Sequence, residues 1–338
     1  MSENTQQDPS PENSSRRSVK RKLLWLTFNL LLAVVLLVGG FGWWLSDYAD
    51  RPLGKALDSF VVQQGDSLSS VSRALEDKNV IPDHRLIMLI ARLNHQETSL
   101  KAGEYRFDAG LSPNQLLDKM THGDVVRRAV RFIDGHTFSQ FRDSLARAQG
   151  LRHVLDGLDD AQVMQKIGHE GVPPEGRFFP ATYDYQLGDS DKDILSRAYD
   201  KMQSALAQGW EGRTESFLKK PYDALILASI VEKETAKPEE RPLIAAVFLN
   251  RLRKGMKLQT DPTVIYGMGA AYQGNIRKKD LLRDTPYNTY TRTGLPPTPI
   301  ANPGQEALDA VFHPASSKAL YFVAKGDGSH YFSDTLAE

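Results

Sequence analysis

The longest apolar stretch of the chain runs from Leu23 to Leu45, which is 23 residues without a charged side chain. At about 1.5 Å per residue, a helix of this length covers the roughly 30 Å hydrocarbon thickness of a bilayer. A cleaved signal peptide has an apolar segment of about 7–15 residues. This run is longer, and it ends with Trp43, Trp44 and Tyr48, which suit the headgroup region. The pattern predicts a retained transmembrane helix over the run.

The charges beside this segment predict its orientation. Five cations precede it directly, namely Arg16, Arg17, Lys20, Arg21 and Lys22. By the positive-inside rule, the N-terminus lies in the cytoplasm and the domains that follow lie outside it. We therefore expect a single-pass membrane protein with extracytoplasmic domains. Residues 1–22 are polar and lack apolar periodicity, so we expect a disordered cytoplasmic tail there.

The pattern of apolar and polar residues over 59–135 predicts a small unit of short strands and helices. Its predicted elements are strands at 60–62, 104–107 and 125–133 and helices at 67–75, 82–93 and 112–120. The segment FVVQQGDSLSSVSRAL resembles the opening of a LysM module, a βααβ unit that binds N-acetylglucosamine polymers. A similar unit that serves as a spacer or packing partner explains the pattern as well, and both interpretations stay open.

The rest of the chain, residues 136–338, predicts a larger and mainly helical domain that closes with a β-hairpin at 320–333. The fold class is therefore α+β. Glycine, proline and aromatic residues gather at 171–183 and predict a loop with a fixed course. Glu175 in this loop is either a functional carboxylate or a structural residue that accepts hydrogen bonds from loop amides, and we favour the structural role.

The helix predicted at 224–236 carries two glutamates near its end. Leu227, Ile230 and Val231 form an apolar stripe that Glu234 continues at position i+7, whereas Glu232 is expected to point elsewhere. A carboxyl on an apolar face is desolvated, and its pKa rises toward the range of a general acid. The alternative is a helix that ends here with both glutamates in solvent, and helical geometry does not decide between the two.

Two segments near 257–267 and 285–297 combine Tyr, Asn, Thr and Gln with few aliphatic residues. Long loops in compact domains are usually functional. Aromatic faces and amides suit sugars, because the rings stack and the amides pair with hydroxyl groups. A rigid structural loop would explain the prolines of these segments but not their polar aromatic residues.

Composition excludes several classes of function. The 338 residues hold 42 Lys+Arg and 42 Asp+Glu, so no excess of cations favours nucleic acid. The absence of cysteine excludes thiol nucleophiles, disulfides and cysteine metal sites. The sequence has no HxxxH pair, GxSxG elbow, Walker motif or GxGxxG fingerprint, and we expect no metal and no cofactor.

Five blocks follow one another in fixed order over about 110 residues: ASIVEKETA, LNRLRKGMKLQTDPTVIYG, PYNTYTRTGLPPTPIANPG, HPA and YFVAKGDGSHYF. Together with KAGEYRF, the single anchor and the LysM-like segment, they resemble the MltG-type (YceG-like) endolytic murein transglycosylases. The resemblance implies that residues 136–338 form the catalytic domain. The catalytic acid of the family is the second glutamate of the EKET block, which falls on Glu234.

The resemblance also implies a location in the cytoplasmic (inner) membrane with periplasmic domains, a reaction and a set of partners. The enzyme cleaves the MurNAc-GlcNAc bond within peptidoglycan glycan strands without water, leaves 1,6-anhydro-MurNAc ends, and so terminates or trims nascent strands beside the cell-wall synthases of the membrane. Candidate residues of the glycan cleft are Gln259, Asp261, Tyr266, Tyr287, Asn288 and Tyr290. The rival hypothesis is a non-catalytic glycan-binding scaffold of the wall-synthesis machinery.

Two departures from the family pattern stand out. The family has a PDTY-like block where this chain has Pro180-Ala181-Thr182-Tyr183, so the usual acid of that loop is absent and is not essential here. The second concerns the C-terminus: the sequence ends at Glu338, just after the hairpin, where the resemblance leads us to expect a further helix.

Overall fold

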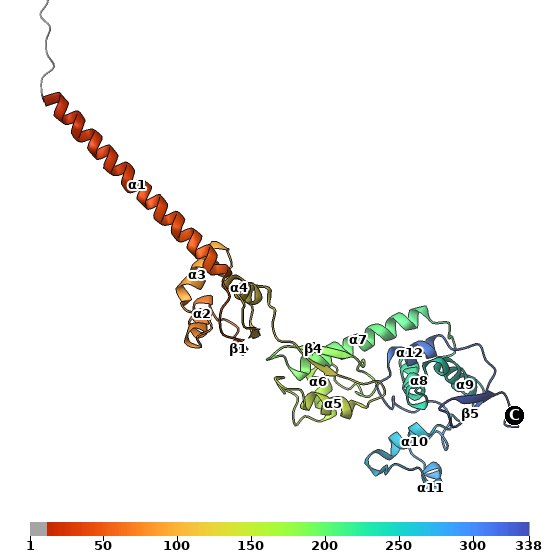
Figure 1. The fold of residues 1–338 in the computed structure, drawn as a ribbon. Helices are drawn as coiled ribbons and strands as arrows, with labels where there is room; N and C mark the ends of the chain where they lie inside the picture. The colour runs from red at the N-terminus through yellow and green to blue at the C-terminus, as the bar shows by residue number, and fades with distance from the viewer. Residues whose placement is uncertain (1–11, 338) are drawn as a thin grey trace, which may run out of the picture. The chain divides into compact units, whose positions relative to one another are not determined.

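The computed structural model describes residues 12–337, with side chains from Lys20 onward. It is a mixed α+β structure, mostly helical, and it divides into two compact units, one that ends at Val126 and one that begins at Arg127 (Figure 1).

The first unit begins with a long helix, α1 (Glu12–Asp50). Its stretch Lys20–Asp50 is long and apolar enough to cross a membrane, as the predicted span at 23–45 requires. The expected disorder of residues 1–22 is wrong for residues 12–22, which are helical. Extending an existing helix costs far less than nucleating one, and Arg and Lys are good helix formers. Residues 1–11 lie outside the described residues.

The end of α1 is part of the core of the first unit. Leu45, Ala49 and Leu53 are buried in the same cluster as the strands and helices that follow. The backbone of Leu53 exchanges hydrogen bonds with the 110–111 turn, and Asp50 accepts one from the Asn114 amide at 2.9 Å. The apolar helix and the small unit are therefore packed together and not joined by a free linker.

The small unit has the element order β-α-α-β-α. Its elements are β1 (Leu57–Val62), α2 (Leu68–Asp77), α3 (His84–Leu93), β2 (Gly103–Phe107) and α4 (Pro113–His122), and β1 pairs antiparallel with β2. Ser112 caps α4 and Pro113 takes its first position, as predicted.

The second unit starts with a two-stranded sheet and three helices. These are β3 (Arg128–Arg131), α5 (Phe138–Ala146), α6 (Asp160–Lys166), β4 (Thr182–Tyr185) and α7 (Asp191–Gly212). The strand expected at 125–133 is shorter, and it pairs with β4 across about 50 residues. For this reason the strand belongs to the second unit. The boundary between the two units lies between Val126 and Arg127 and not, as the sequence predicts, at residue 135.

The centre of the second unit is α8 (Pro221–Glu234), which packs against α7, α9 and α12. Every residue from Ala224 to Val231 is buried. The remaining elements are the 3₁₀ turn η1 (Pro238–Glu240), α9 (Arg241–Arg253), α10 (Asp261–Met268), the turn η2 (Gly269–Ala271), α11 (Lys278–Leu282), α12 (Gln305–Phe312), β5 (Tyr321–Ala324) and β6 (His330–Ser333). Strands β5 and β6 form the predicted C-terminal hairpin.

Two leucines of α1 test the packing of this helix. Leu45 is 5% exposed, whereas Leu37, two turns earlier, is 73% exposed. Leu45→Ala should lower the free energy of opening of the first unit by roughly 2–4 kcal/mol, because it leaves a cavity in a protein core. Leu37→Ala should change it little. Amide hydrogen exchange of the full-length protein in bilayers measures both values, and equal effects would show that α1 is not part of this core.

Candidate functional site

The C-terminal end of α8 places Glu234 beside the start of α10. The Thr260 hydroxyl, at the N-cap position of α10, donates a hydrogen bond to Oε2 of Glu234 at 2.8 Å. This contact joins residues 26 positions apart and holds the carboxyl at the end of a helix whose residues 224–231 are all buried.

Burial raises the pKa of the Glu234 carboxyl above its ordinary value. The Thr260 hydrogen bond opposes this shift, and the nearby charge of Asp261 adds to it. A larger fraction of Glu234 is therefore protonated near neutral pH than of a glutamate in solvent. A general acid requires such an environment.

Glu232 corrects the expectation that Glu234 is the one glutamate directed into the domain. The Glu232 side chain is 5% exposed, accepts a hydrogen bond from Arg241 at 3.0 Å, and accepts another from the Gly304 amide at 3.0 Å. The prediction failed because α8 is buried around its whole circumference, so an apolar stripe does not identify a single inward face. Glu232 ties α8 to α9 and to the start of α12.

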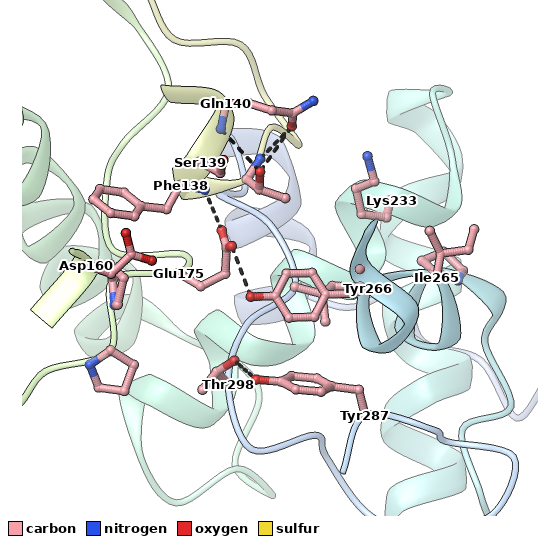
Figure 2. Close-up of a pocket in the computed structure, with 16 residues that line it drawn as sticks. Phe138, Ser139, Gln140, Asp160, Glu175, Lys233, Ile265, Tyr266, Tyr287 and Thr298 are labelled. Carbon is pink, nitrogen blue, oxygen red and sulfur yellow. Dashed lines mark hydrogen bonds between the residues drawn. The ribbon is translucent and has the colours of Figure 1, made fainter. Parts of the chain in front are cut away.

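A cavity of about 970 Å³ lies next to the end of α8. Figure 2 shows side chains from α5, α6, α8, α10 and two loops around it. Its lining includes Phe138, Glu175, Lys233, Ile265, Tyr266 and Tyr287. Glu234 is not part of the lining, although its neighbour Lys233 is.

Glu175 lies in the wall of this cavity and is 8% exposed. Its Oε1 accepts a hydrogen bond from the Phe138 amide at 3.0 Å, and its Oε2 accepts one from the Tyr266 hydroxyl at 3.1 Å (Figure 2). Burial raises the pKa of Glu175 to about 7, and the two hydrogen bonds oppose the shift. The expected bonds from backbone amides are present: one comes from Gly176 in the same loop, and the other comes from Phe138 at the start of α5, 37 residues away.

Four of the six predicted cleft residues gather in two groups. Tyr266 and Tyr287 line the cavity, with ring centroids 4.9 Å apart. Asp261 and Tyr290 pair with each other through a 2.6 Å hydrogen bond from the tyrosine hydroxyl, and the charge of Asp261 acts on Glu234. Helix α10 connects the groups, because Asp261 begins it and Tyr266 lies farther along it.

The other two predicted residues have different surroundings. Gln259 is exposed just before α10 and has a left-handed φ of 50°. Asn288 is buried, its side-chain NH₂ donates to three backbone carbonyls between residues 280 and 283, and its oxygen accepts from the Tyr290 amide. All of its polar side-chain atoms have partners, so Asn288 holds the loop together. It is not part of the 970 Å³ cavity but lines a smaller hollow of about 270 Å³ formed by its own loop.

Lys233 and Phe138 are cavity residues that sequence reasoning missed. The Lys233 ammonium donates to the Gly135 carbonyl at 3.2 Å, a contact between residues 98 positions apart. No local pattern marks such a pair. The one usable signal was the position of Lys233 between two candidate carboxylates.

The described side chains contain two clusters with metal-ligand chemistry, Glu76/Asp83/His84 and His153/Asp156/Asp191. In the first, the histidine Nδ1 and a glutamate oxygen already contact each other at 2.5 Å. In the second, the Asp191 oxygens accept hydrogen bonds from backbone amides of residues 154 and 155. Neither cluster includes a residue of the cavity or Glu234.

Arg241 provides a test of the partner of Glu232, because it also pairs with Glu306, whose side chain is 61% exposed. Glu232→Ala should lower the free energy of unfolding by roughly 3–5 kcal/mol, since it leaves a buried cation without its buried partner. Glu306→Ala should cost at most about 1 kcal/mol. Chemical unfolding of the full-length protein in detergent measures both, and equal losses would contradict the structural role of Glu232.

The raised pKa of Glu175 predicts a pH-dependent stability. The folded state holds the proton more tightly than the unfolded state, so this contribution is complete below pH 4.5 and is lost as the pH rises to about 7. The loss is about 3 kcal/mol, at 1.36 kcal/mol per pKa unit. Between pH 4.5 and 7, the free energy of unfolding should fall more steeply in the wild type than in Glu175→Gln. Parallel curves would contradict the raised pKa of Glu175.

The family model that matches this chain is that of the YceG-like family, over residues 60–338. A curated relative from Bacillus subtilis, named endolytic murein transglycosylase, is 30% identical over 294 residues, which is 82% of this chain and 81% of the relative. A relative of the same name from Streptococcus pneumoniae is 27% identical, and the match covers 93% of this chain and 63% of that protein.

A solved structure agrees with these matches. The crystal structure of a YceG-like protein from Listeria monocytogenes aligns with a TM-score of 0.52 and 31% identity, over 84% of this chain and 98% of that one. The family match covers most of the chain and includes both the Glu234 region and the cavity. This chain belongs to the YceG-like family.

Proposed function

We propose that this protein is a membrane-anchored lytic transglycosylase that cleaves the MurNAc-GlcNAc bond within peptidoglycan strands and leaves 1,6-anhydro-MurNAc ends. Relatives named endolytic murein transglycosylase, 27–30% identical over most of the chain, support the activity. The observation that carries the proposal is the Glu234 carboxyl, which burial keeps protonated to a higher pH than usual at the end of α8.

One carboxyl can carry both proton transfers of this reaction. Protonated Glu234 donates its proton to the glycosidic oxygen as the bond from that oxygen to the muramyl C1 breaks. The 6-hydroxyl of the same sugar then attacks C1, and the Glu234 carboxylate takes the hydroxyl proton. Ordinary glycosidases need a second carboxylate as nucleophile or water-activating base. Here the intramolecular hydroxyl replaces it and gains from proximity.

The surroundings of Glu234 suit this cycle. Thr260 orients one carboxyl oxygen and leaves the other for the substrate. Asp261, held by the Tyr290 hydroxyl, adds negative charge that keeps the proton on Glu234 and stabilises positive charge developing at the sugar. Because the acid must begin protonated, the rate should fall as the pH rises through the pKa of Glu234.

The finer assignments belong to the same proposal. Tyr266 and Tyr287 stack against the glycan, and exposed Gln259 contacts it near the start of α10. The β-α-α-β order of the small unit fits a LysM-like glycan-binding module. Helix α1 anchors the chain in the inner membrane with its N-terminus in the cytoplasm, so that the second unit works in the periplasm beside the wall synthases.

Product analysis tests the proposal. Purified sacculi are incubated with the full-length protein in detergent, and the released fragments are identified by mass spectrometry. We expect anhydromuramyl ends from the wild type and a loss of about 10²–10⁴-fold in Glu234→Gln, which keeps an acceptor for Thr260 but cannot donate an acidic proton. Glu239→Gln, at an exposed glutamate five residues later, is the matched control and should keep full activity.

Three outcomes would contradict the proposal in different ways. Glycan retention without any anhydro ends would favour the non-catalytic scaffold. Reducing ends in place of anhydro ends would show a hydrolase. Full activity of Glu234→Gln would move the acid to another residue.

A further inference from the structure

The 970 Å³ cavity has the size and the chemistry of a ligand site. Pockets for small ligands measure about 300–1,000 Å³ and combine apolar walls with a few polar groups. Here Phe138, Ile265 and three prolines form apolar walls, and the polar groups include Glu175, Thr298 and Lys233. Faces of this kind, with tyrosine rings among them, match a sugar, which has an apolar ring face and a polar edge.

The two tyrosines of the cavity are fixed at both ends. Their rings meet edge to face at an interplanar angle of 64°. The hydroxyl of Tyr266 donates to Glu175 at 3.1 Å, and the hydroxyl of Tyr287 lies 2.8 Å from the Thr298 hydroxyl (Figure 2). Rings held in this way lose little further entropy when a ligand stacks on them.

Glu175 is in turn held rigidly by the second unit. Oε1 accepts from both the Phe138 amide and the Asn302 side-chain amide, at 3.0 and 3.3 Å. Its other oxygen has Tyr266 as its hydrogen-bond partner. The Glu175 carboxyl thus connects the start of α5, the loop before α12 and the Tyr266 ring of α10.

The cavity also begins beside the proposed acid. Lys233 lines it and is the chain neighbour of Glu234, and consecutive Cα atoms lie about 3.8 Å apart. Pro262, two residues after the Thr260 that holds Glu234, lines it as well. Glu234 itself is not part of the lining, so the cavity is a neighbouring site for the next sugars of a strand whose cleaved bond lies at Glu234.

We propose that this cavity is a glycan subsite for N-acetylated sugars of the strand beside the cleaved bond, and that Glu175 is a positioning residue that fixes the Tyr266 ring for stacking. The inference rests on the proposed function and deepens it. Glu175 does not take part in the proton transfers, because its oxygens are occupied by protein donors.

Steady-state kinetics of anhydro-end formation on uncrosslinked glycan strands tests the positioning role. Tyr266→Phe keeps the ring and removes its anchor, and it should raise KM about three- to tenfold with little change in kcat. Glu175→Leu removes the acceptor of the Tyr266 hydroxyl and should do the same, and the double variant should be no worse than either single one, because both remove one interaction. Tyr331→Phe, at an exposed tyrosine of the hairpin, is the control and should match the wild type.

Equilibrium binding separates this inference from the proposed function. In the Glu234→Gln full-length protein, which should not turn over, Tyr266→Leu should weaken the binding of the same strands about tenfold or more. Unchanged binding, unchanged KM or additive effects of Glu175→Leu and Tyr266→Phe would overturn the subsite while leaving the reaction intact. Absence of anhydro ends from the wild type, with the binding difference present, would overturn the reaction and keep the subsite.

Discussion

The structure of the second unit depends on the burial of one helix around its whole circumference. Residues 224–231 of α8 are all buried. At the end of the helix, the largely buried Glu232 and Glu234 require partners from the surrounding elements, whereas Lys233 between them is exposed. Glu232 pairs with Arg241, Lys233 bonds the Gly135 carbonyl, and Glu234 accepts a hydrogen bond from Thr260. Three neighbouring side chains thus acquire three different roles: a structural ion pair, a cavity wall and a candidate acid.

Helix α10 brings the proposed chemistry and the proposed binding together. Its N-cap residue Thr260 holds Glu234, and the half-buried Tyr266 of the same helix donates a hydrogen bond to Glu175. Burial raises the pKa of both Glu175 and Glu234. Both oxygens of Glu175 accept hydrogen bonds from the protein, whereas Glu234 accepts a hydrogen bond from one side-chain hydroxyl. The hydrogen-bond environment therefore separates a positioning carboxyl from a proton donor.

Patterns among neighbouring residues predict the local structure well. They do not predict which residues far apart in the sequence contact each other. The apolar run, the Ser112-Pro113 helix start and the C-terminal hairpin follow from adjacent residues. The β3–β4 pair and the Glu175–Tyr266 contact join positions about 50 and 91 residues apart. The apolar stripe on α8 predicts that Glu234 points into the domain, but it does not predict that Glu232 is buried as well. Asn288 is a residue type that suits sugar binding, but its side chain bonds the backbone of its own loop.

The central claim is that burial at the end of α8 raises the pKa of the Glu234 carboxyl. Titration of its carboxyl carbon by ¹³C NMR in the full-length protein, with the signal assigned by its loss in Glu234→Gln, measures this directly. The account predicts a midpoint above the ordinary glutamate value of 4.5, and a further rise in Thr260→Val, which removes the hydrogen bond that lowers the pKa. A midpoint at or below 4.5 would contradict the account.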